Sequence, residues 1–147
     1  MEKKNLEREL NVYLANLNVL YTKLHNYHWN VSGLGFFELH TQYENFYNQT
    51  SLDLDQVAEV LLSLGYTPMA SMKEYLSVAT IKEREAKKIS TKDSVKEVSE
   101  DFKVMLKSSK EILELAEEEK VQAVIDMAAA FIGNYEKTLW MLRAYLD

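Results

Sequence analysis

The amino-acid sequence predicts an all-α protein, a four-helix bundle with one long crossover, and three observations predict it. Four glycines and one proline among 147 residues are too few for the many turns of an all-β chain. Apolar residues recur at steps of three and four, the spacing of an amphipathic helix, in four long runs. The length and the apolar fraction of 47% suit a single domain, residues 1–147.

The first two helices are delimited by glycines. An apolar run predicts a first helix from Leu6 to Val31, which Gly33 and Gly35 then break. A second run extends from Tyr43 to Leu64 and stops at Gly65, the residue type that most often follows a helix. Two helix turns are predicted over residues 71–79, within a link that covers about residues 65–91.

The third and fourth helices follow this link. Residues 90–93 offer side chains that cap helices, and an apolar run from Val95 to Ala116 comes after them. The last run extends from Val121 to Leu142. The link between the second and third long helices is long enough to run the length of the bundle, and such a crossover is typical of the ferritin-like topology.

Composition excludes several functions. The chain has no cysteine, so it has no disulfide and no thiolate metal ligand. No apolar stretch approaches 18 residues and no signal-peptide core follows the first four residues, so we expect a soluble, cytoplasmic protein with no membrane partner. The net charge of −6, with only Lys3 and Lys4 ahead of the first helix, disfavours binding to a phosphate backbone.

One face of the second helix carries possible metal ligands. With residues placed at about 100° intervals, His40, Glu44, Asp55 and Glu59 fall within a stripe about 100° wide. Imidazole and carboxylate together suit iron, manganese or zinc. The alternative is that these three acids line a solvated face, and spacing alone leaves both interpretations open.

Distance limits how such a site is built. Eleven residues separate Glu44 from Asp55, about 16 Å along a helix, whereas all ligands of one ion lie within about 2 Å of it. Two antiparallel copies of the helix about a two-fold axis would bring the two pairs together. His28 is close to His40 across the short loop. The Glu-x-x-His motif of sites inside a ferritin bundle is absent from the sequence, which favours a site between subunits.

Over nearly its whole length the sequence resembles the Dps family, the miniferritins named for DNA protection in starved cells. The specific part is His28-Trp29-Asn30-Val31, then His40 twelve residues after His28, then Asp55-x-x-x-Glu59. The resemblance implies a hollow homo-oligomer of twelve subunits with a ferroxidase site at each two-fold interface. His28, His40 and the acid at position 44 would come from one subunit, and Asp55 and Glu59 from its partner.

Some roles stay open within this resemblance. The family usually has aspartate where Glu44 stands, and the glutamate side chain is one methylene longer. Three roles therefore stay open for Glu44: a direct metal ligand, a ligand through water, or a residue that only contacts the ligands. Trp29 either intercepts oxidising equivalents or packs at the interface, and His25 either tunes the site or is a hydrogen-bonded interface residue. Asp126 aligns with a family acid that lines the three-fold pore, where carboxylates would concentrate Fe²⁺.

The resemblance implies a ferroxidase that oxidises Fe²⁺ with hydrogen peroxide, or more slowly with dioxygen, and stores the ferric mineral in the shell. Zinc or manganese could replace iron at the sites. One alternative is a DNA-compacting protein with secondary iron activity, which we disfavour because the family commonly uses a lysine-rich terminal extension that this sequence lacks. Another is a structural shell with a vestigial site.

Overall fold

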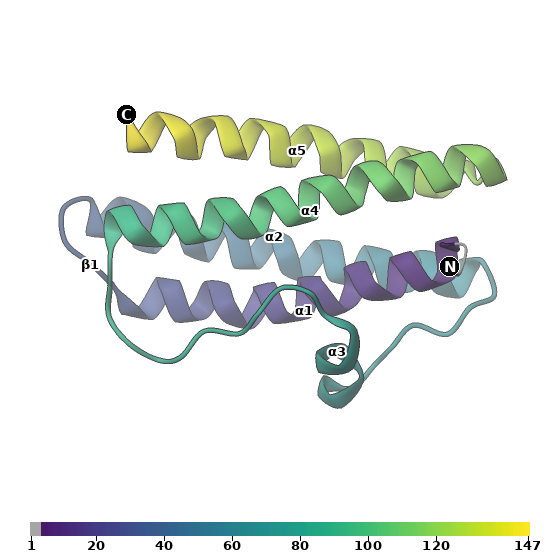
Figure 1. Ribbon diagram of the computed structural model, residues 1–147, viewed down its shortest axis with the longest axis horizontal. Helices are drawn as coiled ribbons and strands as arrows, with labels where there is room; N and C mark the ends of the chain where they lie inside the picture. The colour runs from purple at the N-terminus through teal and green to yellow at the C-terminus, as the bar shows by residue number, and fades with distance from the viewer. Residues whose placement is uncertain (1–3) are drawn as a thin grey trace.

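The computed structural model describes residues 4–147, so Lys3 and the two residues before it lie outside the described part. Four long helices lie side by side along the long axis of the molecule (Figure 1). They are α1 (Leu6–Asn30), α2 (Phe36–Ser63), α4 (Thr91–Glu119) and α5 (Gln122–Leu146). The short helix α3 (Met72–Val78) interrupts the link between α2 and α4. The predicted all-α bundle with a crossover helix is therefore confirmed.

Capping side chains mark the starts of α1, α3 and α4. Asn5 Oδ1 accepts a hydrogen bond from the Arg8 backbone N–H at 2.8 Å at the start of α1, and Ser90 Oγ accepts from the Asp93 N–H at 3.1 Å at the start of α4. At the start of α3, Ser71 Oγ accepts from the Glu74 N–H at 3.3 Å and itself donates to the Glu74 carboxylate at 2.8 Å. Such caps satisfy N–H groups that have no partner within the helix.

One predicted boundary is wrong by a residue, and one connection was not predicted. Val31 is not helical but extended, and β1 (Val31–Ser32) pairs in parallel with β2 (Ile89–Ser90), with Val31 opposite Ile89. The last residues before α4 are thereby fixed to the turn after α1. Helix α2 begins at Phe36, seven residues ahead of its regular apolar run, because Gly35 adopts a positive φ of 83° and ends the turn.

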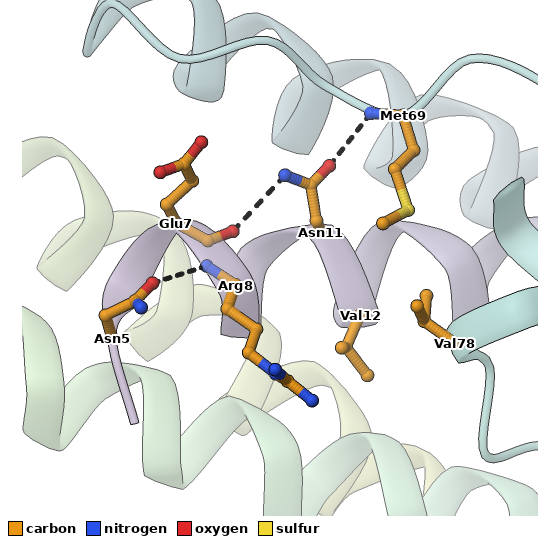
Figure 2. Close-up of a pocket in the computed structure, with 7 residues that line it drawn as sticks. All are labelled: Asn5, Glu7, Arg8, Asn11, Val12, Met69 and Val78. Atoms are coloured by element: carbon orange, nitrogen blue, oxygen red, sulfur yellow. Dashed lines mark hydrogen bonds between the residues drawn. The ribbon is translucent and has the colours of Figure 1, made fainter. Parts of the chain in front are cut away.

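The crossover runs along the outside of the bundle beside α1 (Figure 1). Three asparagines of α1 hold it there. The side-chain oxygen of Asn16 accepts from the backbone N–H groups of Thr80 and Ile81 at 2.8 and 3.0 Å, and Asn11 Oδ1 accepts from the Met69 N–H at 2.8 Å (Figure 2). The Asn26 amide donates to two carbonyls of residues 84–85. These contacts satisfy backbone groups that have no partner in a regular ladder.

The core of the bundle contains polar groups that are paired across helices. Tyr13 Oη lies 2.9 Å from Ser109 Oγ, and Tyr43 Oη lies 2.6 Å from Ser94 Oγ. All four residues are buried. Because an unpaired buried hydroxyl costs free energy, these pairs fix the rotation of α1 and α2 relative to α4.

The described residues also contain no helix that is both long and apolar enough to cross a membrane.

Candidate metal site

Two histidines form the centre of the candidate site, at the turn between α1 and α2. His28 Nδ1 lies 2.6 Å from the His40 carbonyl oxygen, and His40 Nδ1 lies 2.8 Å from the His28 carbonyl oxygen. The two rings stack with centroids 3.7 Å apart and an angle of 13° between their planes. A carbonyl oxygen only accepts, so each Nδ1 carries the proton and donates it. The lone pair of each Nε2 is then available to a metal ion.

The sequence between the histidines produces this contact. Asn30 ends α1, and the chain turns through Gly33 and Gly35, whose φ angles of 116° and 83° disfavour any other residue type. The turn returns α2 along α1, so the first turns of α2 face the last turn of α1 (Figure 1).

Glu44 is the carboxylate nearest to this pair. It lies one helix turn after His40, and its Oε1 is 3.8 Å from His28 Nε2. The His28 ring is buried, whereas the Glu44 side chain is 51% exposed. The structure therefore places His28, His40 and Glu44, three of the five predicted ligands, near the same turn.

Asp55 and Glu59 do not join them. Both are on the exposed side of α2, about 16 Å and more along the helix from Glu44. Within the part of the chain that the structure describes, no three His, Asp or Glu side chains are arranged to hold a metal ion. One subunit thus carries the predicted ligands in two separate groups along α2.

An aromatic cluster adjoins the histidine pair. We define it as Tyr21, His25 and Trp29 of α1 with Tyr47 of α2. His25 stacks on Tyr47 with ring centroids 3.7 Å apart and 16° between the planes, and its Nδ1 donates to the Tyr21 carbonyl oxygen at 2.8 Å. The Trp29 ring is 5.4 Å from His25 and is 71% exposed in the single chain.

Tyr47 is the member of the cluster that contacts the site. Its ring meets that of His28 edge to face, with centroids 5.4 Å apart and 87° between the planes. Desolvation first, and then the negative charge of Glu44, raise the pKa of Tyr47 above its usual value. Tyr47 was not among the predicted site residues, although its position three residues after Glu44 places it on the same helix face.

Asp126 lies far from the histidines. It is in the second turn of α5, near the turn that joins α4 to α5, at the end of the bundle opposite the α1–α2 turn (Figure 1). Its exposed Oδ1 accepts a hydrogen bond from Gln122 Nε2 at 2.7 Å. The carboxylates of Glu117, Glu118 and Glu119 are exposed on the last turn of α4.

A separate pocket of about 390 Å³ lies between the start of α1 and the crossover (Figure 2). Glu7 and Arg8 are its charged lining residues, and Asn11, Met69 and Val78 line the rest with two neighbours. It contains one carboxylate and no histidine, so it lacks the ligands of a transition-metal site.

Known proteins share this architecture. The profile of the family described as "Ferritin-like domain" matches residues 7–147. General stress protein 20U of Bacillus subtilis is 41% identical over 143 residues, which cover 97% of this chain and 98% of that protein. "DNA protection during starvation protein 2" of Bacillus anthracis is 37% identical over 144 residues, 98% of both chains.

A solved structure agrees closely with the fold. The Dps protein from Vibrio cholerae O1, described as a member of a broad superfamily of ferritin-like diiron-carboxylate proteins, superposes with a TM-score of 0.92 at 37% identity. The match covers 97% of this chain and 89% of that one.

Proposed function

The chain belongs to the Dps family of ferritin-like proteins, and on that premise we propose that it is a ferroxidase that oxidises Fe²⁺ and stores the ferric product inside a protein shell. The observation that carries the proposal is the reciprocal bonding of His28 and His40. It fixes both rings with Nδ1 directed at a carbonyl oxygen, so that Nε2 is the nitrogen left to bind a metal ion, and His28 Nε2 lies 3.8 Å from the Glu44 carboxylate. A mixed imidazole and carboxylate set suits iron, with zinc and manganese as possible substitutes.

A two-fold dimer completes the site in this proposal. His28, His40 and Glu44 come from one subunit, with Asp55 and Glu59 of the partner subunit opposite them. The separation of the two sets along α2 supports this arrangement, because antiparallel copies of one helix place the far end of each beside the near end of the other. By analogy with the family, six such dimers form a shell of twelve subunits.

The chemistry needs two electrons for each peroxide. Two Fe²⁺ ions, one H₂O₂ and two protons give two Fe³⁺ ions and two water molecules, and no hydroxyl radical is released. The protein residues hold the two ions close together, so that both electrons reach one peroxide. The carboxylates offset the positive charge that grows as the ions are oxidised. Dioxygen is the slower oxidant in this proposal.

The test is anaerobic Fe²⁺ titration followed by peroxide, with iron oxidation measured by absorbance and hydroxyl radical by spin trapping. Removal of a ligand in His40→Ala or Asp55→Ala is expected to slow oxidation at least about tenfold, since even neighbours of metal ligands commonly contribute that much. Glu38→Gln, an exposed acid earlier on α2, is the matched control and should retain the wild-type rate. Oxidation no faster than in buffer, or insensitive to both alanine variants, contradicts the proposal.

Asp126 is proposed to line the path of Fe²⁺ into the shell. Its exposed position near the α4–α5 turn and the three glutamates before it support an electrostatic role. Asp126→Asn is expected to slow mineral growth several-fold at low salt and less at high salt, measured by stopped-flow absorbance with excess Fe²⁺. Glu111→Gln, a carboxylate paired with Lys4, is the control. Equal rates for Asp126→Asn and wild type at every salt concentration would remove Asp126 from the path.

DNA protection is the alternative function, because relatives carry that name. The net charge of −6 disfavours it. Residues 82–88 contain four basic side chains, but the guanidinium of Arg84 already has partners within the chain. It donates to Asn26 Oδ1 and to the Lys87 carbonyl oxygen, and it pairs with Glu97 at 3.5 Å. We expect duplex DNA to migrate unshifted with the assembled protein at moderate salt. Retention of the DNA would establish binding.

A further inference from the structure

A buried arginine joins the crossover to the last turn of α1. Arg84 lies in the link between α3 and α4, and only 8% of its side chain is exposed. Its Nη1 donates to Asn26 Oδ1 at 2.8 Å and to the carbonyl oxygens of Glu85 and Lys87 at 3.1 and 2.8 Å, and its Nε lies 3.5 Å from Glu97 Oε1. Because a buried guanidinium is costly without such partners, these contacts fix the side chain in one position.

On α1, Arg84 contacts the two residues directly before His28. The guanidinium carbon lies 5.4 Å from the centre of the Tyr27 ring, and Tyr27 Oη donates at 2.8 Å to Glu97 Oε1, the oxygen that Arg84 also approaches. The Asn26 amide in turn donates to two carbonyl oxygens of the crossover. At about 100° per residue, His28 is about 200° from Asn26 around the helix, so Arg84 holds this turn from the side away from the histidine pair.

The reciprocal bonds of the histidine pair depend on where this turn lies. His28 is the third-last residue of α1, so its carbonyl oxygen is one of the last four, which have no N–H partner within a helix. That oxygen accepts from His40 Nδ1 at 2.8 Å. Helix ends fray where nothing holds them, and a displaced last turn would move both the His28 ring and the acceptor of the His40 proton.

We propose that Arg84 is a positioning residue for the candidate metal site, an inference that rests on the proposed function. It holds the last turn of α1 so that His28 and His40 keep their reciprocal bonds and present Nε2 to the metal ion. A guanidinium suits this role because it is always charged and donates in several fixed directions from one plane, whereas an ammonium is a point charge on a flexible stem. The crossover thus determines the geometry of a site to which it contributes no ligand.

The experiment adds Co²⁺, whose visible absorption reports its coordination geometry, to the assembled, metal-free protein in the absence of oxidant. Arg84→Ala is expected to weaken Co²⁺ binding at least about tenfold and to change the absorption spectrum, as the loss of a residue that orients metal ligands commonly does. Arg84→Lys keeps the charge but loses the planar set of donors, and a smaller change in the same direction is expected.

Asn11→Ala is the matched control. Asn11 also ties the crossover to α1, by accepting from the Met69 N–H, but it lies about 25 Å along the helix from His28. This variant should therefore retain the wild-type affinity for Co²⁺ and the wild-type spectrum, even if it lowers the stability of the fold.

The tautomers of the histidine rings give a second readout that needs no metal. The chain has three histidines, so solid-state NMR of protein labelled with ¹⁵N in histidine has three rings to assign. Wild type is expected to carry the proton on Nδ1 at His28 and His40, and Arg84→Ala to populate the Nε2–H tautomer at both. His25 donates from Nδ1 to the Tyr21 carbonyl oxygen within α1, so it should keep its tautomer and serves as the internal reference.

The outcomes separate this inference from the function on which it rests. Wild-type affinity, spectrum and tautomers in Arg84→Ala, or in Arg84→Lys if the alanine variant does not assemble, overturn the role of Arg84. An equal loss of affinity in Asn11→Ala also overturns it, since the crossover would then act only through stability. If wild type binds Co²⁺ but oxidises Fe²⁺ no faster than buffer, the ferroxidase is wrong and the variants still decide the role of Arg84. If wild type binds no Co²⁺, both proposals fail.

Discussion

Subunits with His40→Ala and subunits with Asp55→Ala are expected to be inactive alone and to regain about one quarter of the wild-type sites when they assemble together. Random pairing of equal amounts makes about half of the dimers mixed. In a mixed dimer, one site combines both substitutions. The other combines an intact histidine pair with an intact Asp55 and Glu59 of the partner subunit.

The measurement is peroxide-dependent Fe²⁺ oxidation after the two variants are unfolded together and reassembled, with reassembled single variants beside them. The control is a mixture of His28→Ala and His40→Ala, whose defects lie in the same half of the site, so no pairing restores it. A mixture of His40→Ala and Asp55→Ala that stays inactive, although it assembles to the wild-type size, would mean that each site draws its ligands from one chain.

Lys23→Ala is expected to lower the free energy of unfolding by about 3–5 kcal/mol, because it leaves a buried carboxylate without its partner. Lys23 Nζ of α1 lies 2.8 Å from Asp101 Oδ2 of α4, and the side chains are 11% and 13% exposed. Burial raises the pKa of Asp101 above its usual 3.8, even though the Lys23 ammonium lowers it. The pair joins two helices of the core at the level of the site-bearing half of α1.

The free energy of unfolding lost in Lys23→Ala should be larger at high pH than at low pH. The carboxylate is costly to bury, so its folded-state pKa lies above that of the unfolded chain, and more so without Lys23. The destabilisation is then full above the raised folded-state pKa of Asp101 and shrinks as the pH falls through it, because Asp101 becomes protonated in the folded wild type and the folded variant alike. Urea unfolding at fixed protein concentration measures it, since assembly contributes to apparent stability.

Lys103→Ala is the matched control, since Lys103 pairs with Glu100 at 3.0 Å on the exposed face of α4, with side chains 60% and 73% exposed. Exposed pairs contribute about 0–1 kcal/mol. The double variant Lys23→Met with Asp101→Leu removes both charges and should recover most of the lost stability. If Lys23→Ala lowers the free energy of unfolding no more than Lys103→Ala does, water must reach the Asp101 carboxylate and donate hydrogen bonds to it.

Local sequence determined much of the fold. Each long helix was predicted because the apolar period is a property of consecutive residues and needs no knowledge of the partner helix. The stop at Gly65 and the short helix near residues 71–79 follow from the same local signals, a glycine with positive φ and a capping serine. Val31 is the exception, because its extended conformation depends on pairing with Ile89.

The sequence by itself also determined which side chains share a helix face. The angular positions of His40, Glu44, Asp55 and Glu59 on α2 depend only on their spacing, and the same spacing separates them into two sets. Only the tertiary structure decided how His28 and His40 bond to each other's carbonyl oxygens, and that Tyr47 rather than another tyrosine meets His28. Likewise, only it showed that α1 asparagines hold the crossover. These contacts join residues of different elements, and their geometry is fixed when the helices pack, not by the period within any one of them.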